Sequence, residues 1–303
     1  MAELSGVLII NKMGGMTSHD VVAEVRRLLH KRKAGHTGTL DPEATGILQV
    51  CVGAAAKIAM FLMASEKEYM ATMVLGVRTD TQDSAGKIVS SVKKIDVGEQ
   101  KIREAFSRFT GEIEQIPPMV SAVRYKGRKL YELARQGKEV ERVPRKVKIF
   151  ELEILDCVIP KITFRVVCSK GTYIRTLTSD IGDILGCGAH QAGLVRLRSG
   201  PFRLSDAVTL KELKRMPHPE ERIVPVEGAL SHLPPVKVRD WFGDLLRKNA
   251  MITEADTVDS SPAGHGEVVR IGNCRGELIA VGVVEKKSTD SGDVAVRVLH
   301  LLK

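Results

Sequence analysis

The stretch Gly35-His-Thr-Gly-Thr-Leu-Asp-Pro-Glu-Ala-Thr-Gly46 decides how the rest of the chain is interpreted. Its three glycines allow positive backbone φ angles and a close approach to a ligand. Asp41 precedes Pro42, which favours an extended Asp41 and suits a turn or a helix start. An Asp-Pro pair is also ordinary at the beginning of a helix, and a loop histidine such as His36 is usually just hydrogen-bonded. The stretch therefore allows both a plain turn and a catalytic carboxylate.

Around this stretch, apolar residues recur at spacings that predict both strands and helices. The predicted strands in this part of the chain are Val7–Asn11, Gly46–Val52, Tyr69–Leu75, Lys146–Val158 and Ile162–Val167. The predicted helices are one that starts after an N-cap at Thr17-Ser18, then Ala54–Met63, Ile102–Phe109 and Tyr173–Leu185. Strands and helices alternate irregularly, which indicates a mixed α/β (α+β) fold.

A second, smaller unit is predicted at the C-terminal end. A length of 303 residues suggests about two domains, and Pro234-Pro235 is the best boundary between them. Beyond it, Gly266–Ile271, Gly276–Glu285 and Asp293–Leu302 are predicted strands separated by polar turns. We therefore expect a first domain over residues 1–233 and a small β-rich module over residues 235–303.

The charge of the chain points to an anionic partner. Lys and Arg number 46 against 37 Asp and Glu, a formal net charge of +9, and nucleic acid is the first candidate. Residues 124–148 hold ten basic and three acidic residues, a second cluster spans Arg26–Lys33, and residues 235–303 are net neutral. One basic run is often only a solvated helix face, but two in the same part of the chain favour a binding surface. Aromatic residues make up only 4%, which argues against stacking of successive single-stranded bases.

Several familiar sites are missing from the sequence. The five cysteines form no Cys-x-x-Cys pair, which argues against a disulfide framework and a structural zinc site. No phosphate-binding loop or complete dinucleotide fingerprint occurs, so we expect no metal and no organic cofactor. The most apolar stretch, Ile47–Ala64, contains Gln49 and Lys57 and is not expected to span a membrane. A reducing cytoplasm is the expected location.

Seven blocks together change the interpretation of Asp41. They are Asn11-Lys-Met-Gly-Gly-Met-Thr-Ser-His-Asp20, Gly35-His-Thr-Gly-Thr-Leu-Asp-Pro42, Lys67-Glu-Tyr-Met-Ala71, Leu75-Gly-Val-Arg-Thr-Asp-Thr-Gln-Asp83, Cys168-Ser-Lys-Gly-Thr-Tyr-Ile-Arg-Thr176, Gly188-Ala-His190 and Arg198-Ser-Gly-Pro-Phe202. In this order and spacing the chain resembles the bacterial TruB family of tRNA pseudouridine-55 synthases. The resemblance implies a mixed, largely antiparallel sheet with flanking helices over residues 1–233. It also implies an RNA-gripping insertion at about 124–148 and a PUA-like module at 235–303.

The resemblance further implies isomerisation of one uridine, at position 55 in the T loop of tRNA, after the base is flipped out. Asp41 would be the essential carboxylate, Tyr69 would stack on the target base and assist proton transfer, and Arg175 would keep Asp41 ionised. The implied partner is the T arm of tRNA, with no protein partner required and a monomeric enzyme.

The same resemblance assigns residues that contact the RNA. His36 would occupy the gap left by the flipped nucleotide, and Lys12 and Asp80 would support contacts with the RNA. Leu194 would form an apolar wall of the uracil pocket.

The chemistry of these residues agrees with the resemblance. Cleavage of a glycosidic bond without a metal needs a carboxylate that attacks or stabilises the electron-poor C1′ centre. A carboxylate in a dry pocket tends to protonate, and a buried Arg opposes this. Two other functions stay open: an RNA chaperone or binding protein without catalysis, which the charge distribution fits equally well, and a nucleosidase that releases uracil by hydrolysis. The set Asp41, Tyr69 and Arg175 favours the isomerase, since a binding protein needs no buried carboxylate.

Overall fold

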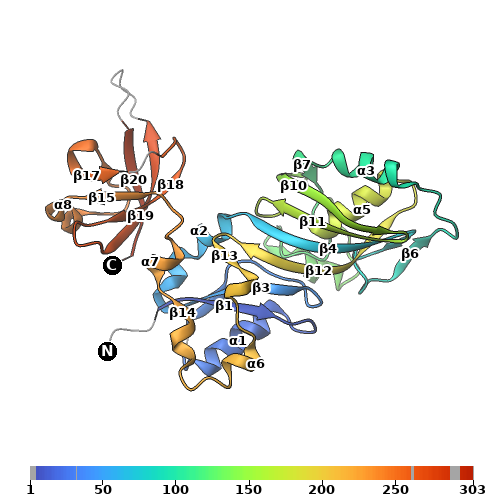
Figure 1. The fold of residues 1–303 in the computed structure, drawn as a ribbon, viewed down its shortest axis with the longest axis horizontal. Coiled ribbons are helices and arrows are strands. Elements are labelled where there is room, and N and C mark those ends of the chain that lie inside the picture. Colours follow the sequence, from blue (N-terminus) through green and yellow to red (C-terminus); the bar gives the residue numbers. More distant parts are fainter. Residues whose placement is uncertain (1–4, 32, 261–262, 287–293, 303) are drawn as a thin grey trace.

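The computed structural model describes residues 5–31, 33–260, 263–286 and 294–302. Two sheets dominate the fold (Figure 1): a ten-stranded sheet formed by the longer N-terminal part and a six-stranded sheet formed by the C-terminal part. The predicted mixed, largely antiparallel sheet with a small β-rich C-terminal unit is confirmed. Among the described residues, no helix is long and apolar enough to cross a membrane.

The large sheet has the strand order β14-β1-β3-β12-β4-β11-β10-β7, with β2 added beside β3 and β13 beside β12. Its strands are β1 Gly6–Lys12, β2 Ala34–His36, β3 Thr45–Val52, β4 Lys67–Leu75, β7 Gly111–Gln115, β10 Arg145–Val158, β11 Lys161–Cys168, β12 Ala189–Ser199, β13 Phe202–Arg203 and β14 Ile223–Val224. All pairings within it are antiparallel except the short parallel contact between β3 and β12.

Helices and two small hairpins surround this sheet. The α-helices are α1 Ser18–Leu28, α2 Ala59–Ala64, α3 Glu99–Ser107, α4 Leu130–Ala134, α5 Ile174–Ile184, α6 Leu210–Leu213 and α7 Val226–Ala229. The 3₁₀ helices are η1 Gly53–Ile58, η2 Leu204–Asp206 and η3 Pro219–Arg222, and the hairpins are β5 Val77–Thr79 with β6 Ile88–Ser91 and β8 Arg124–Tyr125 with β9 Arg128–Lys129.

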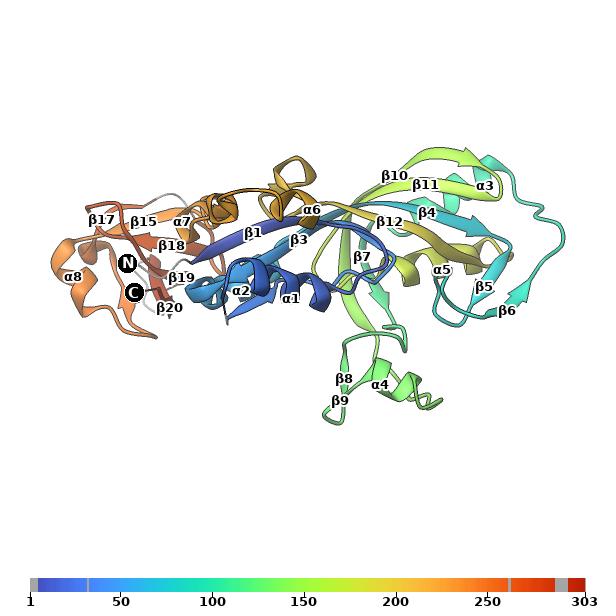
Figure 2. The same cartoon turned by 90° about the horizontal axis from the view of Figure 1, so that it is seen from below.

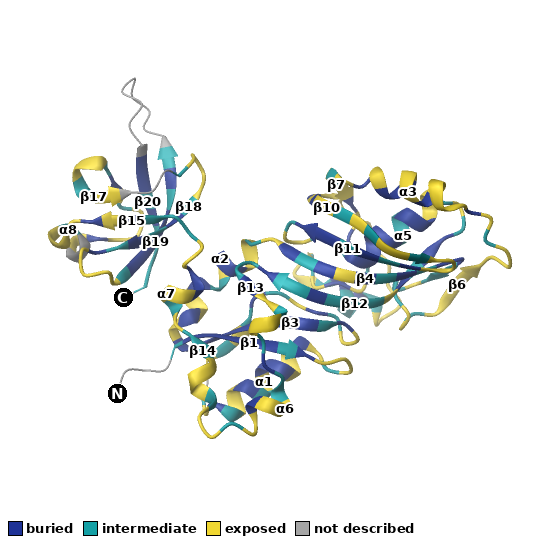
Figure 3. Cartoon of the chain, viewed as in Figure 1, coloured by how far each residue is buried: buried dark blue, intermediate teal, exposed yellow. Residues whose placement is uncertain are grey.

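The sequence explains which faces of the sheet are covered. In β1, Val7 and Ile9 point into one core cluster, whereas Leu8 and Ile10 point into another that α1 completes. This strand is therefore buried on both faces, as a continuous apolar run predicts. In β4, Tyr69, Ala71, Met73 and Leu75 alternate with more exposed residues and pack toward α3 and α5. Figure 3 shows the resulting contrast between buried strands and exposed helix faces.

The contact between β3 and β12 brings the two parts of the large sheet together. Val195 pairs with Thr45 and Arg196 with Gly46. A Cβ on Gly46 would lie 2.3 Å from the carbonyl oxygen of Arg196, and Gly46 has a φ of +98°. Only glycine therefore permits this close backbone approach.

The segment between β7 and β10 projects from the body of the molecule. Figure 2 shows β8, β9 and α4 extending away from the large sheet. This segment contains most of the basic stretch that was predicted as an insertion, residues 124–148. The last residues of that stretch, Arg145–Lys148, belong instead to β10, where they pair with β7.

The C-terminal part forms the six-stranded sheet β16-β20-β19-β18-β15-β17. Its strands are β15 Pro235–Val238, β16 Met251–Ile252, β17 Thr257–Ser260, β18 Val268–Gly272, β19 Leu278–Lys286 and β20 Val294–Leu301, accompanied by α8 Asp240–Leu245 and η4 Glu254–Asp256. Val281 of this sheet joins the core cluster that contains Phe61 and Leu230, so the two parts share apolar packing. That residues 1–233 and 235–303 are separate domains stays a prediction.

The structure corrects some predicted elements. The segment Ala54–Met63 is not one helix. Its first residues belong to η1, which begins at Gly53, where φ is +63°, and the chain becomes α-helical only at Ala59. The helix predicted at Ile102–Phe109 begins earlier, at Glu99. Asp293, the predicted first residue of the last strand, and Arg32, in the second basic cluster, lie outside the described residues.

Candidate active site

Asp41 lies in the loop between β2 and β3, which is held by the start of α1. The Ser18 hydroxyl accepts a hydrogen bond from the Leu40 amide at 2.8 Å and lies 3.0 Å from the Leu40 carbonyl oxygen, to which it donates. The Gly15 amide donates to the Pro42 carbonyl, and the Ala44 amide donates to the Asp41 carbonyl. The Asp-Pro pair thus makes a turn and does not begin a helix.

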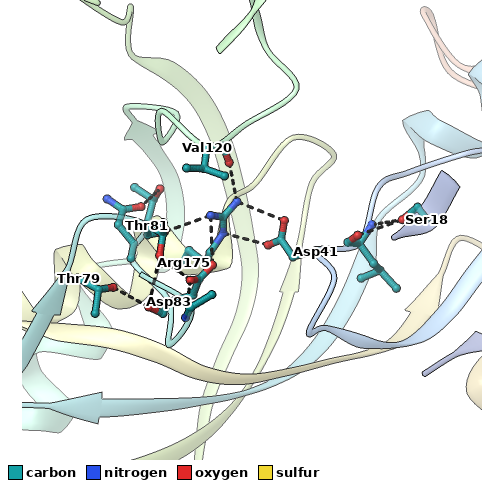
Figure 4. A network of polar contacts seen from close by, with 11 residues as sticks. Ser18, Asp41, Thr79, Thr81, Asp83, Val120 and Arg175 are labelled. Carbon is teal, nitrogen blue, oxygen red and sulfur yellow. Dashed lines mark hydrogen bonds and ion pairs between the residues drawn. The ribbon is translucent and has the colours of Figure 1, made fainter. Parts of the chain in front are cut away.

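Arg175, the second residue of α5, faces this carboxylate (Figure 4). Its Nε lies 3.0 Å from Asp41 Oδ2, and its Nη2 lies 3.3 Å from Asp41 Oδ1. Nη2 also donates to the Val120 carbonyl at 2.9 Å, and Nη1 donates to the Thr81 carbonyl at 3.1 Å. All three guanidinium nitrogens are therefore engaged, which fixes the orientation of the group.

Burial differs sharply between the two partners. The Arg175 side chain is 5% exposed, whereas that of Asp41 is 34% exposed. The carboxylate is thus reachable from solvent while its counter-charge lies behind it. Burial raises the pKa of Asp41, the Arg175 guanidinium opposes this, and the Asp83 carboxylate adds to it. The ion pair limits the tendency of a desolvated carboxyl group to take up a proton.

Asp83 was not predicted as a site residue, although it is the last residue of the block Leu75–Asp83. Its Oδ2 lies 3.4 Å from Arg175 Nη1. Its Oδ1 accepts hydrogen bonds from the Thr81 hydroxyl at 2.6 Å and the Ala85 amide at 3.0 Å. Asp83 is thus a second anion on the same guanidinium. Because the motif holds two aspartates, Asp80 and Asp83, spacing alone could not show which one meets Arg175.

The Asp41 carboxylate opens onto a pocket of about 1000 Å³. This volume is at the upper end of ligand pockets. The wall comes from four places: the start of α1, the loop before Asp41, the β5–β6 turn, and the projecting segment. The lining includes the basic side chains Lys129, Arg135 and Lys138 from that segment. Lys129 and Arg135 also lie over the ring of Tyr131, at 5.4 Å from its centroid in each case.

Tyr69 and Leu194 lie in the sheet beneath the loop. Tyr69 is 9% exposed and belongs to the same core cluster as Leu40, and Leu194 packs against that cluster. Leu194 pairs with Ala71, two residues along β4 from Tyr69. Burial raises the pKa of Tyr69, and the positive charge of Arg196 opposes this rise. The phenol therefore stays protonated at neutral pH.

Lys12 is buried beside the Asp41 turn. It is 1% exposed, and its Nζ donates to the carbonyls of Met13, Met16 and Pro42 at 3.0, 2.7 and 2.8 Å. Burial lowers the pKa of Lys12 to about 8. With the ammonium group covered by three carbonyls, a direct contact with RNA does not fit this geometry. Lys12 instead ties the end of β1 to the Asp41 turn.

His36 and Asp80 both line the pocket. The His36 Nδ1 is buried and has no hydrogen-bond partner within the described part of the chain. Burial and the nearby Arg196 lower the pKa of His36, so the ring is neutral at pH 7. Asp80 is exposed at the β5–β6 turn, where its Oδ1 accepts from the Lys87 amide at 2.8 Å.

No group of three or more His, Cys, Asp or Glu side chains that could hold a metal ion occurs among the described residues. The arrangement offers an accessible carboxylate, Asp41, with the buried cation Arg175 behind it and basic side chains in the pocket wall. Such a set can stabilise or attack an electron-poor carbon of an anionic ligand.

Comparison with protein families identifies the chain. A model described as the TruB family pseudouridylate synthase (N terminal domain) matches residues 26–174, and the tRNA pseudouridylate synthase B C-terminal domain matches residues 175–231. The chain belongs to the TruB family of pseudouridylate synthases. The resemblance noted in the sequence is thereby confirmed, and this TruB-family chain is an isomerase. Both matches end before Pro234, so they leave the six-stranded unit unassigned.

Relatives of this TruB-family chain carry the name tRNA pseudouridine synthase B. The protein from Alkaliphilus oremlandii is 41% identical, and the match spans 99% of this chain and 99% of the relative. That from Dechloromonas aromatica is 45% identical, over 92% of this chain and 91% of the relative. Among solved structures, the crystal structure of a Cbf5-Nop10-Gar1 complex matches with a TM-score of 0.76 and 31% identity, over 98% of this chain and 85% of the other. A structure of an H/ACA RNP bound to a substrate RNA containing 2′-deoxyuridine matches with a TM-score of 0.72 and 30% identity, over 98% and 85%.

Proposed function

We propose that this protein converts uridine to pseudouridine at position 55 in the T loop of tRNA. The observation that carries the proposal is the two-point contact of the buried Arg175 with Asp41, which lines a pocket that also holds the basic side chains Lys129, Arg135 and Lys138. Family membership supports the reaction, and the names of the relatives support tRNA as the substrate. The T loop and position 55 rest on the resemblance of the sequence blocks.

The reaction breaks the bond between C1′ and N1 of uracil and forms a bond between C1′ and C5. N1 gains a proton and C5 loses one, so the RNA keeps its mass. In our proposal Asp41 attacks or stabilises the C1′ centre while the base turns within the pocket. Arg175 keeps the carboxylate ionised, and Tyr69 and Leu194 form the apolar side on which the base rests.

Access to C1′ and C5 requires that the nucleotide leave its stack. We propose that His36 fills the vacated space, for which its neutral ring is suited, and that Asp80 contacts the RNA from the β5–β6 turn. The basic residues within 124–148 would hold phosphates of the T arm, since Lys129, Arg135 and Lys138 line the pocket. The proposal includes a monomeric enzyme that works in the cytoplasm without a protein partner or a cofactor.

The experiment uses tRNA transcripts that carry tritium at C5 of every uridine. Wild-type protein should release label equivalent to one uridine per tRNA, and a transcript with cytidine at position 55 should release none. Release from the second transcript at the same level would contradict the assigned position. Release of free uracil, with the RNA mass lowered by one uracil less one water, would identify a nucleosidase, and tRNA binding without either change would identify a chaperone or binding protein.

A further inference from the structure

Arg196, on β12, is a buried cation that the proposed mechanism does not use. It is 3% exposed. Throughout the described ranges, no carboxylate lies within ion-pairing distance of it, in contrast to Arg198 two residues later, which pairs with Glu66 and Glu68. Burial of a charge without an ion pair is costly, and such groups cluster at functional sites. Arg196 therefore calls for an explanation beyond packing.

The Arg196 guanidinium connects both ends of the Asp41 loop. Its Nη2 donates to the Gly38 carbonyl at 3.1 Å, three residues before Asp41. Its Nε donates to the Ile47 carbonyl at 2.8 Å, just after the loop enters β3. The close approach of Gly46 to the Arg196 backbone brings the side chain within reach of both carbonyls.

Arg196 also stands opposite Tyr69. The two residues are cross-strand partners in the antiparallel pair β12–β4, so their side chains share one face of the sheet. The positive charge of Arg196 opposes the rise that burial causes in the pKa of the Tyr69 phenol. A guanidinium only donates hydrogen bonds, so a phenol oxygen beside it can only accept. A Tyr69 hydroxyl in that role would direct its proton away from Arg196.

We propose that Arg196 is a positioning residue of the isomerase site, which acts by orienting the Tyr69 hydroxyl and by fixing the Gly38 end of the Asp41 loop. The inference rests on the proposed function, because an oriented phenol matters only if a base is bound beside it. In this proposal the Tyr69 hydroxyl proton points toward the bound base. Arg196 sets this direction but does not itself touch the RNA.

The first test is a double-mutant cycle of Arg196→Met and Tyr69→Phe, with single-turnover pseudouridine formation at saturating tRNA. In the presence of Tyr69, Arg196→Met should lower the rate at least ~10²-fold, with a change below ~3-fold in the dissociation constant for tRNA. In the Tyr69→Phe background the same substitution should cost at least ~5-fold less. Equal losses in both backgrounds would overturn the proposal. Arg198→Met, on the same strand, is the matched control and should change the rate less than ~3-fold.

The second test needs no turnover and so separates this inference from the proposed function. Protein labelled with ¹³Cζ-tyrosine gives a resonance for Tyr69, assigned by its loss in Tyr69→Phe. Arg196→Met should shift this resonance and raise the pKa of Tyr69, whereas Arg198→Met should do neither. If Arg196→Met does not fold, Arg196→Lys replaces it in both tests, since it keeps the charge but loses the planar fork. An unchanged Tyr69 resonance in a folded Arg196 variant would overturn the proposal even if the wild type forms pseudouridine.

Discussion

The Arg175 guanidinium meets the Asp41 carboxylate at two points, with Nε 3.0 Å from Oδ2 and Nη2 3.3 Å from Oδ1. The same group is held by the carbonyls of Val120 and Thr81 and by the carboxylate of Asp83. Segments that are far apart in the chain therefore together fix the orientation of the Asp41 carboxylate. Because the floor of the pocket is prearranged in this way, little reorganisation is needed when substrate binds.

Replacement of Arg175 by lysine tests whether this geometry matters beyond the charge. Lysine keeps a positive charge but cannot present two parallel donors to a carboxylate. We expect Arg175→Lys to lower the single-turnover rate at least ~10²-fold and to leave tRNA affinity within ~3-fold. Arg78→Lys is a suitable control, because Arg78 pairs with Asp183 at an exposed position. Equal activity in both variants would show that the charge alone suffices.

The pH dependence of the rate should report the charges around Asp41. The carboxylate must be ionised to act, so activity falls as the pH drops through its pKa, which burial raises. Arg175→Gln removes the opposing cation and should move the acidic limb of the profile to higher pH. Asp83→Asn removes a like charge and should move that limb to lower pH. Shifts in the same direction in both variants would contradict this electrostatic account.

The structure predicts that Lys12 contributes to stability and not to RNA affinity. Lys12→Met leaves three carbonyls without their donor, and we expect the free energy of unfolding to fall by at least ~2 kcal/mol. Urea denaturation measures this change. Lys129→Met, at the pocket wall, should alter the free energy of unfolding by less than ~0.5 kcal/mol but weaken tRNA binding. The opposite pattern would show that Lys12 acts in RNA binding and not in stability.

The projecting segment should account for part of the salt dependence of tRNA binding. Neutralisation of Lys129, Arg135 and Lys138 to glutamine should flatten the log–log slope by about 0.7 to 0.9 for each lost phosphate contact. The matched control neutralises Lys93, Lys94 and Lys101, which are exposed and do not line the pocket. Unless the first triple variant changes the slope more than the control, the segment is only a solvated surface.

The sequence predicted the strands that show strong apolar patterns and missed those that do not. β1 and β3 follow continuous apolar runs, and the N-cap at Thr17 is present as expected. β12 was missed, although it carries Leu194 and Arg196, because Gly193 and two arginines interrupt its alternation. β12 is held as a strand by its pairing with β4, a contact between residues that are distant in sequence.

The sequence likewise predicted some features of the candidate site and missed others. Asp41 and Arg175 could be selected from motif blocks, and the structure brings them into contact. The roles of Lys12 and Asp83 depend on which carbonyls and cations surround them, and no local pattern encodes that arrangement. A lysine is usually exposed, and the sequence does not show that the Lys12 ammonium group donates to three carbonyls.

The most direct test of the account is tritium release from C5-labelled tRNA by Asp41→Asn, measured under single-turnover conditions beside the wild type. Asparagine keeps the shape of the side chain but removes its charge and most of its nucleophilicity. We predict a rate at least ~10⁴-fold lower, which corresponds to about 5 kcal/mol of barrier, with tRNA affinity much less affected. Tritium release at the wild-type rate by folded Asp41→Asn protein would contradict the assignment of Asp41 as the essential carboxylate.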